Sequence, residues 1–461
     1  MNRHMVPSLV VLGVALASMP ASAQQPAPVS LLPGDQEAAP APPPARTSVD
    51  TAFEGTEFAS NPVVQDLGPQ IVEWPIDAAA QLVFTLETID GEGLNPRDYE
   101  LEALRSAVLS GPGPELDAIA SRNFIWLVED MRDGRTPMEA RRQWFVVDPD
   151  PDLYRSNDLL EQVAQTGDVA GIIKGLRPGH ADYMRLIKAL KETPKTQAGK
   201  RKLIMANLDR WRWLPRDLGY RYLLTNVPEY QLRLTVNGRI ISTYRTIVGK
   251  PGSTATPQLA EKVQGVIFNP NWTVPQSIVK GEGLGARVLG NPGWAKANGY
   301  KGWKDEQTGF VTVVQQPGAN NSLGRMKLDM PNPHAIFLHD TPSRHLFANE
   351  NRALSHGCIR TERALELAIT MAIVGKGATR DEAVEIASSG EYTKVAMQTE
   401  FPVYITYFTV ASDIDGELKT FKDIYGRDEP VLAALDQPRQ ANRARKTSEE
   451  AVEIIDDLQT T

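Results

Sequence analysis

Residues 339–360 read HDTPSRHLFANENRALSHGCIR, and the rest of the chain can be arranged around them. They hold the only cysteine of the protein, Cys358, and three of its six histidines, His339, His345 and His356. Cysteine is a soft nucleophile, and imidazole is a base that titrates near neutral pH. Gly357 permits a tight turn that presents the thiol and leaves backbone N–H groups for an oxyanion. The stretch therefore predicts a nucleophilic cysteine site.

Composition predicts a soluble globular protein of two or three domains, because the chain has 461 residues, of which 41% are hydrophobic and 23% charged. The formal net charge is -8, from 49 Lys and Arg against 57 Asp and Glu. No basic domain stands out, so nucleic acid is excluded as a partner. Nothing in the sequence indicates an oligomeric state.

The first residues have the pattern of an export signal. A short polar start is followed by a mostly apolar run at 6–17 and by the small residues Ala21-Ser22-Ala23. We expect cleavage after Ala23, no stable membrane insertion afterwards, and a periplasmic location in a Gram-negative-type envelope. In an oxidising compartment a solitary thiol without a role is a liability, which favours a reactive Cys358 over an inert buried one.

The fold class is predicted to be α+β, with a helical domain followed by a β-rich domain. Residues 24–60, which include the run APAPPPA, are expected to form a disordered Pro/Ala-rich linker. Residues 61–205 show helical periodicity and are interpreted as a scaffold domain without catalytic residues. Helices are expected at 77–84, 101–109, 116–131, 158–165 with Asn157 as N-cap, 181–192 and 198–213.

Apolar residues alternate from residue 219 onward, and residues 206–425 are assigned to the β-rich domain. Asn237-Gly238 predicts a hairpin turn between two strands, and further strands are expected at 263–268, 335–338 and 403–408. Thr361 is expected to cap a helix over 364–373, which would put Cys358 close to a positive helix end. The polar residues 426–461 are expected to form a loose or partly helical tail.

Residues 269–332 are rich in Gly and Pro, and we expect them to form an irregular capping subdomain. Such a long loop is typical of a lid, although its aromatic residues could instead pack a small core of their own. The candidate lid residues are Trp272, Trp294, Tyr300 and Trp303.

A nucleophilic cysteine needs a base and oxyanion donors. His339 follows a predicted strand and ranks first as the base, His356 second and His345 third. Arg360 could bind a substrate carboxylate or pair with Glu362. A zinc site of Cys358 with the three histidines is the weaker alternative, because the spacing matches no common zinc motif. No metal and no cofactor are expected.

The spacing of His339, fifteen residues, then Ser355-His356-Gly357-Cys358 resembles the signature of L,D-transpeptidases with a YkuD-type catalytic domain. The segments LHDTP at 338–342 and NPNWTVP at 269–275 resemble the larger periplasmic branch typified by YcbB. Residues 206–425 resemble the catalytic part of this branch closely. The helical residues 66–200 resemble its scaffold domain, but through less specific motifs. That branch commonly has Arg where this chain has Arg360.

This resemblance implies a cysteine acyltransferase, of the class EC 2.3.2.-, that cross-links peptidoglycan stem peptides in cell wall biogenesis and the maintenance of cell shape. It implies that Cys358 is the nucleophile and His339 the general base, that Ser355, His356 and Gly357 shape the oxyanion loop, and that Arg360 places the substrate. The larger members also carry a peptidoglycan-binding domain, for which residues 192–200 of this chain leave no room. Members without this domain can use a different donor peptide, so cross-links of either the 3→3 or the 1→3 type are expected. The alternatives are an L,D-carboxypeptidase or another thiol hydrolase, and a non-catalytic wall-binding protein.

Overall fold

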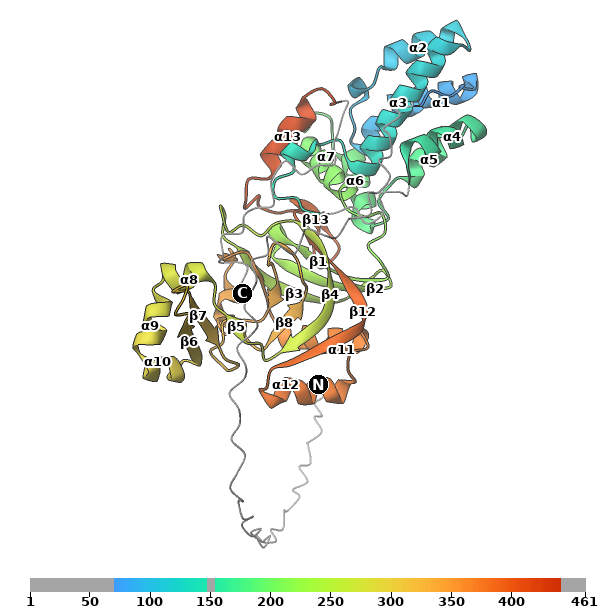
Figure 1. The fold of residues 1–461 in the computed structure, drawn as a ribbon. Coiled ribbons are helices and arrows are strands. Elements are labelled where there is room, and N and C mark those ends of the chain that lie inside the picture. The colour runs from blue at the N-terminus through green and yellow to red at the C-terminus, as the bar shows by residue number, and fades with distance from the viewer. Residues whose placement is uncertain (1–69, 147–153, 441–461) are drawn as a thin grey trace, which may run out of the picture. The chain divides into compact units, whose positions relative to one another are not determined.

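The structure is a computed structural model that describes residues 70–146 and 154–440 (Figure 1). These residues belong to the unit Leu67–Thr461. The expected signal and linker, and the last part of the expected tail, lie outside the described residues. Within the described ranges, no helix is both long and apolar enough to cross a membrane.

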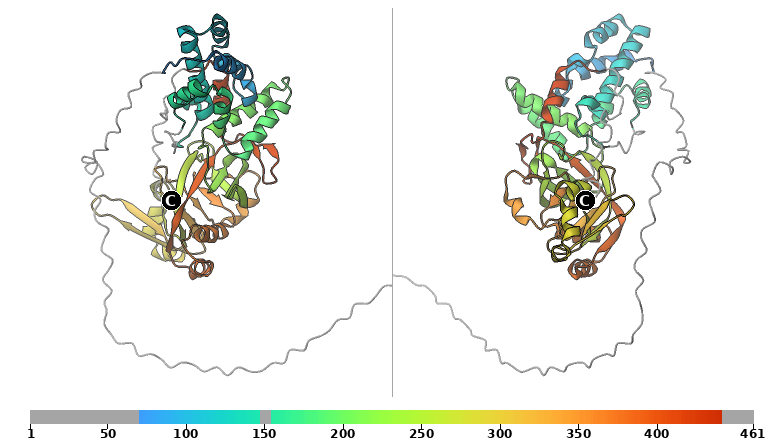
Figure 2. Two further views of the ribbon diagram at one scale, coloured as in Figure 1. Left: turned by 90° about the vertical axis from the view of Figure 1, so that its right-hand side faces the viewer. Right: turned by 60° about the vertical axis from the view of Figure 1, so that its left-hand side comes forward.

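Helices make up the part of the chain that precedes the first strand (Figure 2). The described α-helices there are α1 (Ile76–Glu87), α2 (Leu101–Ser110), α3 (Pro114–Asp133), α4 (Ser156–Thr166), α5 (Val169–Gly175), α6 (Ala181–Glu192) and α7 (Ala198–Arg212). The short 3-10 helices are η2 (Ile89–Glu92), η3 (Pro96–Asp98) and η4 (Met138–Ala140). The expected helices are confirmed, and α5 is an addition to them.

Capping residues explain where several of these helices begin. At α6, His180 accepts a hydrogen bond from the Asp182 N–H and caps the helix. At α5, the Asp168 side chain accepts from Gly171, a signal that the sequence analysis overlooked. The expected cap Asn157 is wrong, because α4 already begins at Ser156 and no side chain caps it.

The β-rich part is a sheet that closes on itself. Its strands are β1 (Arg221–Asn226), β2 (Gln231–Val236), β3 (Arg239–Gly249), β4 (Leu259–Phe268), β8 (Met326–Asp329), β9 (Leu338–His339), β10 (Ala353–Ser355), β11 (Ile359–Thr361) and β12 (Thr393–Thr406). Their order is β10-β3-β11-β9-β8-β4-β12-β1-β2, and the additional β2–β3 pairing completes a ring that leaves only β10 outside it. The α+β class is therefore confirmed.

The hairpin turn predicted at Asn237-Gly238 is present, with φ of 50° and 67° at the two residues. The strand expected at 335–338 is only partly present: β9 covers Leu338–His339, and Ala335 has a φ of 48° that no strand allows. This kink turns the Ala335 carbonyl toward the site described below.

The expected irregular insertion is largely folded. It contains β5 (Trp272–Thr273), α8 (Gln276–Gly281), α9 (Leu284–Gly290), α10 (Pro292–Ala297), β6 (Tyr300–Lys304) and β7 (Val311–Gln315). The strands form a separate sheet in the order β5-β7-β6, and the three helices gather around it (Figure 1). The predicted end at residue 332 is wrong, because β8 pairs with β4 and β9 in the main sheet.

After Cys358 the chain continues as a strand. Thr361 is the last residue of β11, and α11 (Ala364–Val374) begins three residues later with Arg363 at its N-cap. The expected helix over 364–373 is confirmed, but the expectation that Thr361 caps it is wrong. The helix α12 (Arg380–Ser389) follows.

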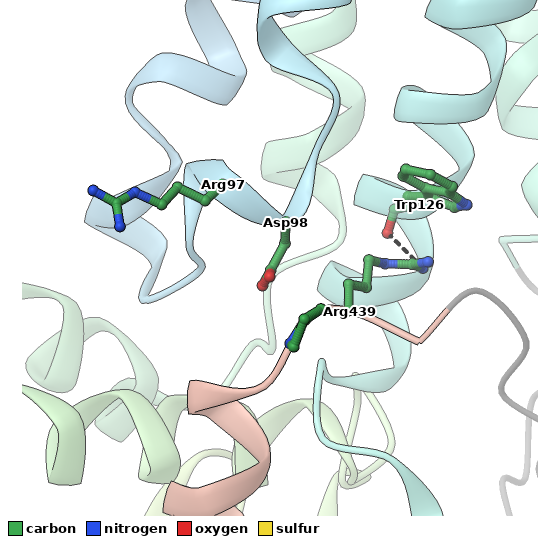
Figure 3. A pocket seen from close by; sticks show the side chains of 5 residues that line it. Arg97, Asp98, Trp126 and Arg439 are labelled. Carbon is green, nitrogen blue, oxygen red and sulfur yellow. Dashed lines mark hydrogen bonds between the residues drawn. The ribbon is translucent and has the colours of Figure 1, made fainter.

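The C-terminal segment packs against the helical part. β13 (Val410–Ser412) pairs with β14 (Leu418–Thr420), and α13 (Asp428–Asp436) follows them. Beyond α13, Arg439 forms an ion pair with Glu129 at 2.5 Å and donates to the Trp126 carbonyl (Figure 3). The expected loose or partly helical tail is thus helical over α13, and Arg439 ties it to Glu129 and to the buried Asp130 of α3.

The junction between the two parts is a continuous apolar core. Trp211 belongs to this core and stacks on Phe408 with ring centroids 4.4 Å apart. Helix α7 runs through residue 205, so the predicted boundary falls inside one helix. Only residues 193–197 separate α6 from α7.

Candidate active site

The loop that carries Cys358 joins two short strands, β10 and β11, and is closed by hydrogen bonds of its own. The Ser355 hydroxyl donates to the Cys358 carbonyl at 2.6 Å and accepts from the Gly357 N–H at 3.2 Å. Gly357 has a φ of 122°, a conformation that other residues rarely adopt. Ser355 and Gly357 therefore shape the turn that presents the nucleophile.

Strand register gathers the functional side chains on one face. β11 runs parallel to β9 and pairs Arg360 with His339, and β9 pairs His339 with Lys327 of β8. Paired residues of neighbouring strands project from the same face, and so do residues two apart in one strand. Lys327, His339, Arg360 and, at the mouth of β11, Cys358 therefore converge.

The thiol of Cys358 is recessed, with only 6% of the residue exposed. Its sulfur donates to the Ala335 carbonyl at 3.6 Å, which is made possible by the kink at that residue. A thiol held by a carbonyl is oriented in its protonated form, because a carbonyl oxygen can only accept.

His339 is buried and neutral. Its Nδ1 lies 2.6 Å from the backbone carbonyl of Asp340, so this nitrogen carries the proton and Nε2 has the lone pair. Burial, together with the charges of Arg360 and Lys327, lowers the pKa of the ring to about 3, and hydrogen bonds to the backbone of Asp340 and Leu323 offset part of this effect. The imidazole is therefore neutral at physiological pH, with the lone pair of Nε2 available to a proton donor.

Asp340 fixes the segment that holds His339. Its carboxylate accepts from the Arg325 N–H at 2.9 Å and pairs with Arg344 at 3.4 Å. Gly324 has a φ of 63°, and a Cβ there would lie 2.5 Å from the Asp340 side chain. The carboxylate thus supports the loop and does not contact the imidazole Nδ1, which is bonded to the backbone.

Two partly buried cations lie near the thiol. Burial lowers the pKa of Arg360 and of Lys327, and in both cases the charge of Cys358 acts in the opposite direction, which places both cations within electrostatic reach of the sulfur. The alternative pairing of Arg360 with Glu362 is wrong, because Glu362 pairs with Arg245 at 2.5 Å. The Arg360 Nε is buried without a hydrogen-bond partner among the described residues.

Lys327 was not predicted from the sequence. Its ammonium lies 3.5 Å from the centroid of the Phe337 ring and interacts with Asp329 as well as Cys358. The alternation MKLD at 326–329 carries the signal of a strand with two charged residues on one face. That signal was hidden because the segment was interpreted as part of an irregular insertion.

The remaining histidines lie apart from this cluster. His356 is exposed in the Cys358 loop, and His345 is exposed in η6 (Arg344–Ala348). His334 is buried against Phe145, with ring centroids 4.2 Å apart. Across 70–146 and 154–440, no group of three or more His, Cys, Asp or Glu side chains is arranged to hold a metal ion.

The candidate lid residues have two different environments. Trp272 is buried in the core of the insertion. The rings of Trp294 and Tyr300 stack with centroids 5.6 Å apart, and the Arg287 guanidinium carbon lies 3.8 Å from the Trp294 ring centroid. Trp303 in β6 is 53% exposed. Three of the four aromatic residues thus hold the insertion together, and Trp303 is left facing solvent.

Comparison with known proteins gives two matches to protein families. Residues 220–396 match the L,D-transpeptidase catalytic domain family YkuD, and residues 73–190 match the Scaffold domain family. Both lie within the parts described above as β-rich and helical.

A Haemophilus influenzae protein that bears the provisional name of an L,D-transpeptidase is 31% identical over 298 residues. The alignment covers 60% of this chain and 60% of that relative. A crystal structure of Mycobacterium tuberculosis L,D-transpeptidase 1 covers 41% of this chain and 61% of its own, with 12% identity and a TM-score of 0.18, which is too low to support an argument.

Proposed function

The chain belongs to the L,D-transpeptidases through its YkuD catalytic domain at residues 220–396, and from this premise we propose that it cross-links peptidoglycan stem peptides. The proposed enzyme is a cysteine acyltransferase that acts through a thioester. Its donor and acceptor are both stem peptides. The observation that carries the proposal is the convergence of Cys358, His339, Arg360 and Lys327 from three adjacent strands.

The first half of the reaction acylates the enzyme. The neutral His339 accepts the thiol proton at Nε2, and the sulfur of Cys358 attacks the carbonyl carbon of the donor peptide. Backbone N–H groups of the Cys358 loop stabilise the oxyanion. The C–N bond then breaks, His339 returns the proton to the leaving amine, and a thioester remains on the sulfur.

The surrounding charges make this proton transfer possible although the resting imidazole is a weak base. The imidazolium is disfavoured by Arg360 and Lys327 as long as the thiol is neutral. Once the thiolate forms, its negative charge faces the same two cations and offsets their repulsion of the imidazolium. Transfer of the proton is therefore coupled to the appearance of the nucleophile.

The second half transfers the acyl group. An amine of a neighbouring stem attacks the thioester carbonyl, loses a proton to His339, and displaces the sulfur, which regains the thiol proton. Arg360 is suited to hold a substrate carboxylate, because its buried Nε has an unused hydrogen-bond donor. Water in place of the amine would make the same site an L,D-carboxypeptidase.

We place the enzyme in the periplasm, where its substrate lies. The expected signal at 1–23 supports this location. The bond that is cut sets the cross-link: attack at the carbonyl of diaminopimelate, residue 3 of the stem, gives 3→3 links, and attack at the carbonyl of L-Ala, residue 1, gives 1→3 links.

Intact mass measurement with purified muropeptides tests the proposal. We expect an acyl adduct on Cys358 whose mass identifies the bond that is cut, and no adduct on Cys358→Ala. Dimeric products indicate transfer, whereas trimmed monomers indicate the carboxypeptidase. A wild-type protein that remains unmodified and leaves the muropeptides unchanged would refute the enzymatic function and favour a wall-binding role.

A further inference from the structure

Thr256, in the loop between β3 and β4, contacts the nucleophile loop through its hydroxyl. The hydroxyl donates to the Gly357 carbonyl at 2.7 Å and accepts from the Gly249 N–H at 2.8 Å. Thr256 is fully buried, so water does not compete for these bonds. Rotation of the hydroxyl about the Cα–Cβ bond would break one of these two hydrogen bonds.

The bond to the Gly357 carbonyl determines where the next N–H points. In a trans peptide the carbonyl and the N–H lie in one plane and point in opposite directions. The peptide between Gly357 and Cys358 therefore directs the Cys358 N–H away from Thr256. Because Ser355 holds the preceding N–H and the following carbonyl, this peptide plane is fixed on both sides.

We infer that Thr256 is a positioning residue that aims the Cys358 N–H at the oxyanion formed during acylation. This inference deepens the proposed function, on which its physiological meaning rests. It predicts a selective defect: reactions of the thiol that form an oxyanion depend on Thr256, and reactions that form none do not.

The C-terminal segment supports this arrangement. The Tyr425 hydroxyl donates to the Gly249 carbonyl at 2.6 Å and accepts from the Thr256 N–H at 3.3 Å. Arg427 donates to the Thr256 carbonyl at 3.0 Å and lies over the Tyr425 ring at 4.8 Å. Burial raises the pKa of Tyr425 to about 12, so the phenol keeps the proton that it donates.

Two simple reagents separate the chemistry. With 4-nitrophenyl acetate, the sulfur attacks the ester carbonyl, an oxyanion forms and collapses, the C–O bond breaks, and 4-nitrophenolate leaves while the acetyl group stays on sulfur. With iodoacetamide, the sulfur displaces iodide from a saturated carbon, and no oxyanion forms. Both reactions report on Cys358, which is the only cysteine.

The test uses the mature protein with Thr256→Val, which keeps the shape of the side chain and removes the hydroxyl. We expect acylation to slow by about 10- to 100-fold while alkylation changes less than about twofold, because a misaimed oxyanion donor affects only acylation. Thr256→Ser should restore acylation. Thr246→Val is the matched control, because Thr246 is equally buried and its hydroxyl has no hydrogen-bond partner among the described residues.

Equal slowing of both reactions by Thr256→Val would overturn the inference, as would unchanged acylation or the same defect in Thr246→Val. A wild-type protein that is alkylated but never acylated would overturn it too, because the loop would then hold no oxyanion donor. If Thr256→Val does not fold, Tyr425→Phe replaces it, with a smaller but equally selective loss expected. Failure of the proposed function gives a different result: the muropeptides remain unchanged, whereas 4-nitrophenyl acetate still acylates Cys358.

Discussion

The neutrality of His339 makes a quantitative prediction about pH and stability. The folded protein holds the pKa of this ring at about 3, because burial and two nearby cations oppose its charge. In the unfolded chain the pKa returns to about 6.5. Between these values the unfolded state binds one proton that the folded state does not bind.

The sign and size follow from this difference. Stability rises with pH wherever the unfolded state binds more protons, so this histidine destabilises the protein as the pH falls below about 6.5. At pH 5.0 the loss relative to pH 7.5 is about 2 kcal/mol, from about 1.5 pH units at about 1.4 kcal/mol each. The loss would reach about 5 kcal/mol only near pH 3.

The perturbation is His339→Asn, whose amide nitrogen replaces Nδ1 as donor to the Asp340 carbonyl and does not titrate. Urea unfolding, monitored by tryptophan fluorescence, measures the free energy of unfolding at pH 7.5 and at pH 5.0. We expect the wild type to lose about 2 kcal/mol more than the variant between the two pH values. His345→Asn, at an exposed position, controls for removal of a histidine.

A second measurement reads the ring directly. The NMR signals of the His339 ring should stay unchanged from pH 8 to pH 5, because the neutral form persists throughout. Equal pH-dependent losses in wild type and His339→Asn, together with a ring that titrates near pH 6.5, would refute the reasoning.

Three further predictions concern the same region. Lys327→Met should slow iodoacetamide alkylation of Cys358 at pH 7 by about tenfold, because one of the two cations facing the thiolate is lost. The control Lys301→Met, at an exposed position, should leave the rate unchanged. A faster reaction of Lys327→Met would contradict the proposed attraction between Lys327 and the thiolate. Gly357→Ala should abolish acylation in the intact-mass assay and lower the free energy of unfolding by about 1–3 kcal/mol, since its φ is 122°; full activity would show that the turn is not required. Arg427→Met should lower the free energy of urea unfolding by about 3 kcal/mol, because its buried hydrogen bonds leave acceptors unpaired; a change below about 0.5 kcal/mol would count against this.

Local signals in the sequence were enough for much of the fold. The turn at Asn237-Gly238 is dictated by two adjacent residues that tolerate positive φ, and it fixed the hairpin correctly. Helix α6 was placed correctly at both ends, because its cap His180 and its apolar period lie within one short segment. In each case the determining interactions are between residues near each other in the chain.

The misplaced elements depend on long-range pairing. Residues 326–329 form a strand only because β4 and β9, far apart in sequence, lie on either side of them. Thr361 looks like a helix cap in isolation, but pairing with Thr246 of β3 keeps it in a strand. Cross-strand pairing is invisible to a local pattern, so the insertion was extended too far and Thr361 was interpreted as a helix cap.

The sequence singled out Cys358 and His339 but not the charges around them. Cys358 and His339 stand out because reactive residue types are scarce in this chain and cluster in one stretch. The expected source of thiolate stabilisation, a helix terminus, is absent at Cys358. The positive charges near the thiol belong instead to Lys327 and Arg360, and their placement depends on the register of three strands.

This arrangement has a consequence for how the nucleophile is controlled. A helix terminus provides partial charge whatever the side chains are, whereas here both positive charges belong to side chains that substrate could engage. A substrate carboxylate bound by Arg360 would neutralise one cation and raise the basicity of His339, which that cation suppresses. The same carboxylate would weaken the attraction between Arg360 and a negative charge on the Cys358 sulfur. Binding and activation of the nucleophile are therefore linked through Arg360, and its replacement should affect both.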